Sequence, residues 1–130
     1  MLYFAYGSNL SSENLKPLNL NLKKIRNYLL KDYQLVFREP YGDPDIEEKK
    51  GNFVHGVLYF INSRDEKVLD MYEEYPKYYL KKYNTNPNFM FYQMKDKTKP
   101  TKPNQNILTH VLYGYKEHGF DTRFLRNLKN

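Results

Sequence analysis

The chain opens with a short apolar run, residues 2–6, that ends in the polar stretch Gly7-Ser8-Asn9. This pattern is typical of a buried strand followed by a tight turn. Because Gly7 has no side chain, the turn can direct backbone N–H groups toward one point, which suits a carboxylate or a developing oxyanion. Taken alone, however, a Gly-Ser-Asn turn is more often an ordinary strand end.

Imperfect alternation of apolar and polar residues in the next part of the chain predicts further strands. Residues 20–38 indicate two strands, of which 30–37 is the better. Residues 39–52 are rich in Pro, Gly and charged side chains, so they predict a polar loop. Residues 53–61 follow as a strong strand.

Capping residues and apolar spacing predict the helices. A short helix should end near Leu18, and Ser63 with Glu66 fits a capping box for a second helix that runs to about Glu73. Apolar residues at helical spacing predict a third helix that Gly119 ends. A last short helix should follow Asp121.

Residues 79–83 and 88–94 predict a hairpin, and residues 95–106 a long loop of Lys, Pro and Asn. Strands and helices therefore interleave, which predicts a mixed α/β fold. Without an internal repeat or a shift in composition, we expect residues 1–130 to form one domain.

Composition narrows the class of protein. With 40% hydrophobic and 17% aromatic residues the chain is globular, and no apolar run reaches the roughly 20 residues that cross a bilayer. The N-terminus lacks a basic leader, so we expect a cytoplasmic protein that contacts no membrane. Zero cysteines exclude disulfides, thiol catalysis and thiolate metal sites.

The net charge of +6 raises the possibility of an RNA-binding module. The densest basic run, Lys95 to Lys102, is interrupted by Pro100 and contains no aromatic side chain that could stack on a base. We therefore expect a solvated loop and no nucleic-acid partner. A mild positive field would also attract an anionic small molecule.

Several blocks of the chain resemble the γ-glutamylcyclotransferase family (AIG2-like). The resemblance lies in Leu2-Tyr3-Phe4-Ala5-Tyr6-Gly7-Ser8-Asn9-Leu10, His55-Gly56-Val57-Leu58-Tyr59, Leu69-Asp70-Met71-Tyr72-Glu73, Tyr79-Leu80-Lys81 and the segment from Gly114 through Leu128. These blocks appear in the family's order. The resemblance implies a small closed barrel of mixed strands flanked by helices, and a chemistry that needs no cofactor and no metal.

The activity implied by the resemblance is cyclisation of a γ-glutamyl amino acid or peptide to 5-oxoproline, with release of the amine. The substrate's own α-amine attacks its γ-carbonyl, so the enzyme mainly holds the attack geometry. It also needs a base for the ammonium proton and donors for the developing oxyanion. The partner is then a small-molecule γ-glutamyl substrate, and the protein a monomer or a homodimer.

Glu73 is the candidate general acid/base. On spacing alone, Glu73 and Glu74 fit a solvated helix end. However, Glu73 occupies the last position of the block that resembles the family's Leu-Asp-x-x-Glu motif, whose Glu is the acid/base residue. The helix C-terminus and the nearby Asp70 and Glu74 would each raise the pKa of this carboxyl group.

The resemblance also implies the residues that bind substrate. Tyr6, Gly7, Ser8, Asn9 and Leu10 would hold the glutamyl moiety, much of it through backbone groups. Tyr79 and Tyr92 match positions of pocket tyrosines in relatives. Either ring alone is about as typical of a protein core.

Details of the motifs leave the substrate open. Tyr6-Gly7-Ser8-Asn9 is similar to the branch that acts on γ-glutamyl amino acids, yet Glu74 stands where better-studied members have Gly, and Ile107 where they have Tyr. A γ-glutamylamine cyclotransferase and a non-catalytic γ-glutamyl-binding protein therefore remain as alternatives. Compensating positive charge from Lys97, Lys99 and Lys102 is a further hypothesis.

The three histidines lack the spacing of a metal site. We expect His55 to be structural. We expect His118, near a helix end, to be a surface residue that interacts with the helix dipole.

Overall fold

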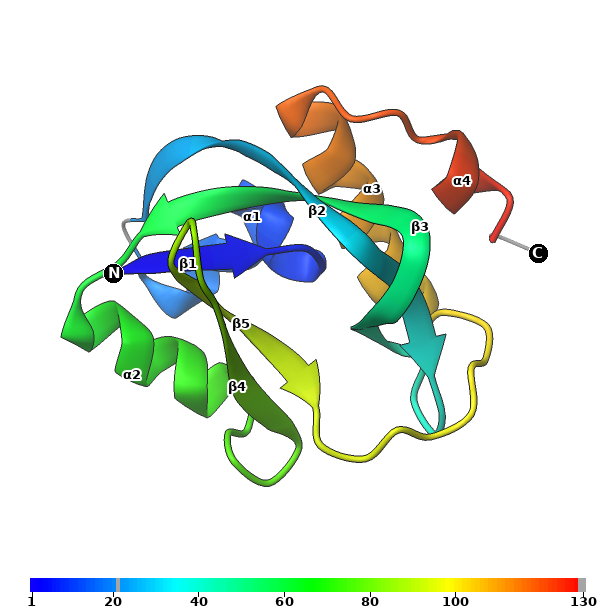
Figure 1. The fold of residues 1–130 in the computed structure, drawn as a ribbon, viewed down its shortest axis with the longest axis horizontal. Helices are drawn as coiled ribbons and strands as arrows, with labels where there is room; N and C mark the ends of the chain where they lie inside the picture. Colours follow the sequence, from blue (N-terminus) through cyan, green and yellow to red (C-terminus); the bar gives the residue numbers. More distant parts are fainter. Residues whose placement is uncertain (21, 129–130) are drawn as a thin grey trace.

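A five-stranded mixed sheet of order β2-β3-β1-β5-β4 forms the centre of the molecule (Figure 1). The computed structural model describes residues 1–20 and 22–128. The predicted central strand is confirmed, because β1 pairs antiparallel with β3 and parallel with β5. The strands are β1 (Leu2–Ala5), β2 (Lys23–Arg38), β3 (Asp43–Phe60), β4 (Tyr79–Asn84) and β5 (Phe89–Met94).

Helices are packed around this sheet and complete the mixed α/β fold. In the view of Figure 1, α2 lies beside β4, while α3 and α4 lie at the opposite side of the picture. The helices are α1 (Ser12–Leu15), α2 (Ser63–Tyr72), α3 (Gln105–His118) and α4 (Arg123–Arg126), with single 3-10 turns η1 (Ser8–Leu10) and η2 (Lys16–Leu18). None of the helices within the described ranges combines the length and hydropathy needed to cross a membrane.

The long hairpin β2–β3 differs from the prediction. Instead of two strands and a polar loop over 39–52, one strand of 16 residues pairs with one of 18, and the turn between them is only residues 39–42. Pairing runs from Lys23 with Phe60 to Arg38 with Asp43. The charged segment forms a strand because an antiparallel ladder satisfies its backbone while the side chains of residues 48–52 face water.

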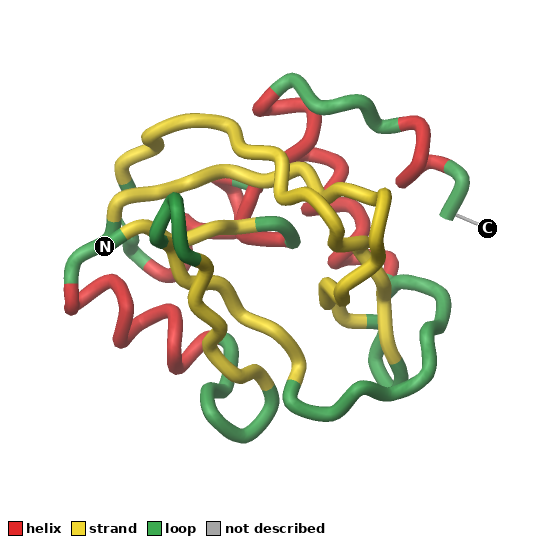
Figure 2. Tube along the Cα trace, viewed as in Figure 1, coloured by secondary structure: helices red, strands yellow, loops and turns green. Residues whose placement is uncertain are grey.

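The sheet is curved but not closed, which corrects the expected barrel. Within residues 1–20 and 22–128 the edge strands β2 and β4 do not pair with each other. Side chains connect the far part of β3 to β5 instead: Asp45 Oδ1 accepts from Met94 N at 2.9 Å, and Gln93 Nε2 donates to Ile46 O at 2.9 Å. In the trace of Figure 2, β5 and the curved end of the β2–β3 hairpin are separate from each other.

The helix ends follow from the sequence with one correction. The N-cap of α2 is Asn62 rather than Ser63: Asn62 Oδ1 accepts from Asp65 N at 2.8 Å, and the Asp65 carboxylate accepts from Asn62 N at 3.2 Å. The capping box therefore begins one residue earlier, because an Asn side chain caps as well as Ser. Gly119 ends α3 in the left-handed conformation, with φ 81°, as predicted.

Candidate functional site

A cavity of about 260 Å³ lies beside the C-terminal end of β1. Six segments that are distant in the sequence meet there: the β1 turn, the start of β3, the end of α2, the starts of β4 and α3, and β5. Among the described residues, its lining consists of Tyr3, Tyr6, Gly7, Ser8, Asn9, Asp43, Pro44, Tyr72, Glu73, Glu74, Tyr78, Tyr79, Tyr92 and Ile107.

Glu73 faces the β1 turn across this cavity. It is the C-cap residue of α2, and its N–H bonds to Leu69 O at 2.9 Å, so its side chain leaves the helix where the backbone turns away. Glu73 Oε1 accepts from Asn9 Nδ2 at 3.4 Å. Asn9 is itself held by Tyr3 at 3.0 Å and Asn14 at 2.9 Å. The structure thus brings the predicted acid/base residue and the predicted turn together.

The environment of Glu73 favours its neutral form. Burial and, to a smaller extent, the negative charge of Asp43 raise the pKa of this carboxyl group to about 8, against the lowering effect of the Asn9 hydrogen bond. The predicted direction is therefore correct, but the charged neighbour is not the expected one. Asp70 binds Lys81 Nζ at 2.8 Å and accepts from Tyr92 Oη at 2.7 Å instead.

The β1 turn approaches β3 closely at Gly7. A side-chain carbon at Gly7 would lie 3.0 Å from Pro44 Cγ, closer than ordinary van der Waals contact, so a larger residue would require Pro44 to shift by a few tenths of an ångström. Four of the five predicted turn residues, Tyr6 to Asn9, line the cavity. The side chain of Leu10 is fully buried and lies outside the lining, where its carbonyl oxygen contacts His118 Nε2 at 2.9 Å.

Family comparison agrees with this geometry. Residues 3–113 match the family described as Gamma-glutamyl cyclotransferase, AIG2-like. The chain belongs to this family. The resemblance to the family is thereby confirmed, and membership of it supports cyclotransferase activity in general terms.

Solved structures show the same fold. An uncharacterized protein, loc79017 from Homo sapiens, is 23% identical with a TM-score of 0.79, over 98% of this chain and 85% of that one. A structure named Gamma-glutamyl cyclotransferase is 23% identical with a TM-score of 0.78, over the same shares. YkqA from Bacillus subtilis is 20% identical with a TM-score of 0.84, over 99% of this chain and 52% of that one. No curated protein matches the chain.

The tyrosines of this cyclotransferase-family pocket form a rigid frame. Both predicted tyrosines line it: Tyr79 Oη donates to Pro44 O at 2.6 Å, and Tyr92 Oη to Asp70 at 2.7 Å. Tyr6 Oη donates to Tyr92 O at 2.6 Å. Burial, and then the charge of Glu73, raise the pKa of Tyr79. These hydroxyls therefore stay protonated and hold the cavity walls in place.

The two departures from the family pattern both lie at the pocket. Ile107, in the first turn of α3, gives an apolar wall where the better-studied members have a hydroxyl. Glu74 has φ 51°, a conformation that glycine adopts without strain and that is uncommon for Glu. The sequence could not reveal this conformation, because a Glu at a helix end is unremarkable.

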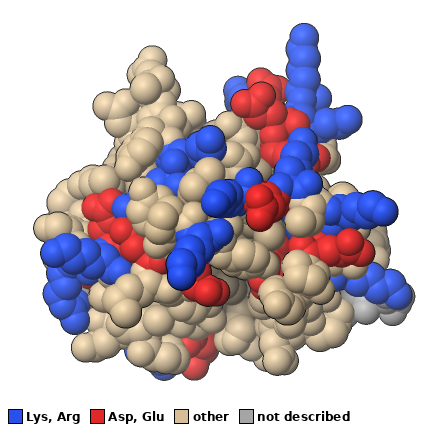
Figure 3. All heavy atoms as spheres, turned by 90° about the horizontal axis from the view of Figure 1, so that it is seen from below, with Lys and Arg blue, Asp and Glu red and all other residues tan. Residues whose placement is uncertain are grey.

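The structure does not support the roles predicted for His118 and for the lysines of the loop after β5. His118 is not a surface residue, since its side chain is 6% exposed and joins the end of α3 to the turn. Lys97 lies 3.5 Å from Glu47, and neither Lys99 nor Lys102 lines the pocket. On the face in Figure 3, basic side chains are interspersed with acidic ones rather than gathered into one patch.

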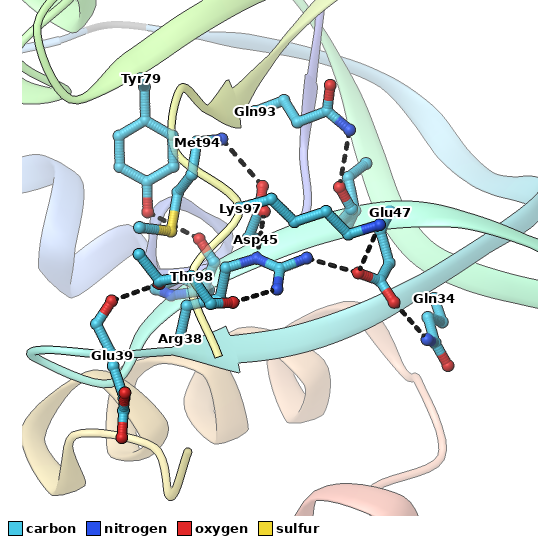
Figure 4. Close-up of polar contacts among 12 residues, drawn as sticks. Gln34, Arg38, Glu39, Asp45, Glu47, Tyr79, Gln93, Met94, Lys97 and Thr98 are labelled. Atoms are coloured by element: carbon cyan, nitrogen blue, oxygen red, sulfur yellow. Dashed lines mark hydrogen bonds and ion pairs between the residues drawn. The ribbon is translucent and has the colours of Figure 1, made fainter. Parts of the chain in front are cut away.

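A buried ion-pair network centred on Arg38, which the sequence does not predict, lies next to the part of β3 that lines the pocket (Figure 4). Arg38 is 1% exposed; its Nε donates to Asp45 at 2.7 Å, and its other nitrogens donate to Glu47 and to Thr98 O. Burial raises the pKa of Asp45 in spite of Arg38. Because Asp45 follows Asp43 and Pro44 directly, the network fixes the segment that forms one pocket wall.

Proposed function

We propose that the protein is a cyclotransferase that converts a γ-glutamyl amide into 5-oxoproline and a free amine, with Glu73 as general acid/base. One observation carries the proposal: a carboxyl group with a raised pKa faces the Gly7 turn within a single pocket, and Asn9 connects the two. Membership of the cyclotransferase family supports the same reaction class.

The reaction needs a base and an acid in turn, and one carboxyl group can serve as both. The α-amine nitrogen attacks the γ-carboxamide carbon, a C–N bond closes the five-membered ring, and the ammonium proton passes to the Glu73 carboxylate. The protonated Glu73 then gives this proton to the leaving nitrogen, and the original amide bond breaks. A pKa of about 8 suits both transfers near neutral pH.

The β1 turn is the proposed cradle of the glutamyl moiety. It leads into the single 3-10 turn η1. The first backbone N–H groups of such a turn have no hydrogen-bond partner within the turn. Ser8 and Asn9 add side-chain donors. Tyr79 and Tyr92 form the walls that exclude water from the reacting groups.

Replacement of the base tests the proposal. Purified protein is incubated with γ-glutamyl-alanine and γ-glutamyl-ε-lysine, and 5-oxoproline is measured. We expect Glu73→Gln to lower the rate by about 10²–10⁴-fold, which is the usual contribution of general acid–base catalysis. Glu48→Gln, an exposed position on β3 away from the pocket, is the matched control.

Two results would contradict the proposal. Wild-type turnover by Glu73→Gln would exclude this carboxyl group as the acid/base. Tight retention of a γ-glutamyl compound without product would instead indicate a binding protein with the same pocket.

A further inference from the structure

The side-chain amide of Asn9 connects the proposed base to helix α1. Its Nδ2 donates to Glu73 Oε1 at 3.4 Å and to Tyr3 Oη at 3.0 Å, so both amide hydrogens are in use. Its Oδ1 accepts from Asn14 Nδ2 at 2.9 Å. Asn9 is 3% exposed, so its partners come from the protein rather than from bulk water. The groups around this amide therefore set its orientation.

The orientation of the Asn9 amide determines which form of Glu73 it stabilises. An amide presents a donor on one side and an acceptor on the other. With Nδ2 toward Glu73, Asn9 stabilises the carboxylate, and this hydrogen bond lowers the pKa of Glu73 against the effect of burial. With the amide turned over, Oδ1 would accept from the neutral acid and repel the carboxylate. The two orientations thus favour opposite protonation states of one group.

Asn14, in α1, holds the orientation that is observed. Its Nδ2 is the one donor that the described residues direct at Asn9 Oδ1. The same nitrogen donates to Tyr72 Oη at 3.1 Å, at the end of α2, so its two hydrogens bond to two different elements. Asn14 is half-buried and lies outside the lining of the pocket. It can therefore act on Glu73 only through its neighbours.

We propose that Asn14 is a positioning residue for the reaction: it holds Asn9 with Nδ2 toward Glu73, so that the carboxylate that accepts the ammonium proton keeps its donor. Tyr72 has a supporting role, because it fixes the Asn14 amide from the side of α2. The inference rests on the proposed cyclisation with Glu73 as general acid/base. Asn14 itself touches no reacting atom.

The other ionisable groups around Glu73 are unaffected by a change at Asn14. Two carboxyl groups share the pocket, Asp43 of β3 and the adjacent Glu74, and among the described residues that line it none is Lys, Arg or His. The remaining ionisable groups of the lining are the phenols of Tyr3, Tyr6, Tyr72, Tyr78, Tyr79 and Tyr92. A neutral replacement of Asn14 therefore weakens one donor to Glu73 without adding or removing a charge in the pocket.

Replacement of Asn14 by Leu tests the proposal, because Leu keeps the shape of the side chain and removes its donors. The pKa of Glu73 is measured by NMR titration of its carboxyl carbon, whose signal is identified by its absence in Glu73→Gln. We expect Asn14→Leu to raise this pKa by about 0.5–1 pH unit, since the hydrogen bond to the carboxylate is long and only partly lost. The step in the pH profile of kcat/KM should move upward with it.

Two further variants connect the effect to the network. Tyr72→Phe keeps the ring and removes the second partner of Asn14, so it should raise the pKa of Glu73 by a smaller amount. Asn106→Leu makes the same replacement at an exposed position in the first turn of α3 and should leave both measurements unchanged. Thermal unfolding shows whether each variant folds, and Tyr72, which is 40% exposed, is the safer substitution.

The two measurements separate this inference from the proposed function. If the wild type releases 5-oxoproline from neither γ-glutamyl-alanine nor γ-glutamyl-ε-lysine, the proposed cyclisation is wrong, while the titration of Glu73 still shows whether Asn14 orients Asn9. If 5-oxoproline forms but the pKa of Glu73 in Asn14→Leu is unchanged or lower, only the inference is wrong. A fall in kcat/KM without movement of the pH step would also overturn it, because that is the result of a merely structural role.

Discussion

The protein keeps the Glu73 carboxyl group neutral at pH values at which an exposed Glu would be ionised. Its pKa of about 8 lies above the ordinary value of 4.5, because burial and Asp43 penalise the carboxylate. A group whose pKa is raised on folding stabilises the folded chain below its unfolded pKa and loses that contribution as pH rises through its folded pKa. The contribution of Glu73 to the free energy of unfolding should therefore decrease as pH rises from about 4.5 to about 8.

The same pKa predicts the pH dependence of catalysis. The carboxylate must accept a proton first, so kcat/KM should rise with pH and level off above about 8. A pH–rate profile with γ-glutamyl-alanine measures this step. A flat profile across that range, or an unchanged step in Glu73→Gln, would contradict the assignment.

At the scale of elements, α3 is fitted against the β1 turn. Gly114 of α3 faces the turn: a side-chain carbon there would lie 2.8 Å from the Leu10 carbonyl carbon and 3.0 Å from Ser11 N. His118, one turn later, contacts Leu10 O. The helix therefore sets the position of the turn that is the proposed cradle of the glutamyl moiety.

Gly114→Ala tests this fit. Helix propensity alone predicts a gain of about 1 kcal/mol from Ala, whereas overpacking against the turn predicts a loss of about 1–3 kcal/mol. We expect the loss to prevail in denaturant unfolding, with a parallel fall in 5-oxoproline release. Tyr113→Ala, at the adjacent and 52% exposed position, is the control. A more stable Gly114→Ala would show that the helix and the turn are not tightly fitted.

The elements also show what the sequence could predict. β1, the β4–β5 hairpin, α2 and α3 carry apolar periodicity and capping residues, and the structure confirms all four. The N-terminal part of β3, residues 43–52, has no apolar periodicity and no capping residue. Its side chains are largely polar, and it forms a strand because β2 pairs with it. The sequence therefore predicts a loop at Asp43 and gives no sign that Asp43 lies close enough to Glu73 to raise the pKa of Glu73.

Over the whole molecule, the Arg38 network takes the place of barrel closure. It joins β2 to β3 through Asp45 and Glu47, β5 through the Asp45–Met94 bond, and the loop after β5 through Thr98. A buried arginine with two carboxylates is stable only while every charge keeps its partner. The open edge of the sheet is therefore held by a small number of strong, mutually dependent contacts.

Arg38→Met should show this dependence. Removing the guanidinium leaves the buried Asp45 without its cation and leaves Glu47 with only the exposed Lys97 at 3.5 Å, which costs about 3–5 kcal/mol for a buried pair. Thermal and urea unfolding measure the loss. The exposed pair of Arg123 with Asp121 provides the control, since Arg123→Met should leave Tm unchanged. Equal effects of the two substitutions would mean that the buried network does not hold the sheet together.

The crowding of phenol rings at the cavity has a practical consequence. The chain has 14 Tyr and no Trp, and six of those tyrosines line the pocket. Its intrinsic ultraviolet emission thus comes from tyrosine alone, and a large share of the emitters stand where a substrate would displace water. Occupancy can be followed by a change in that emission on the unlabelled protein, without a coupled assay or an added dye.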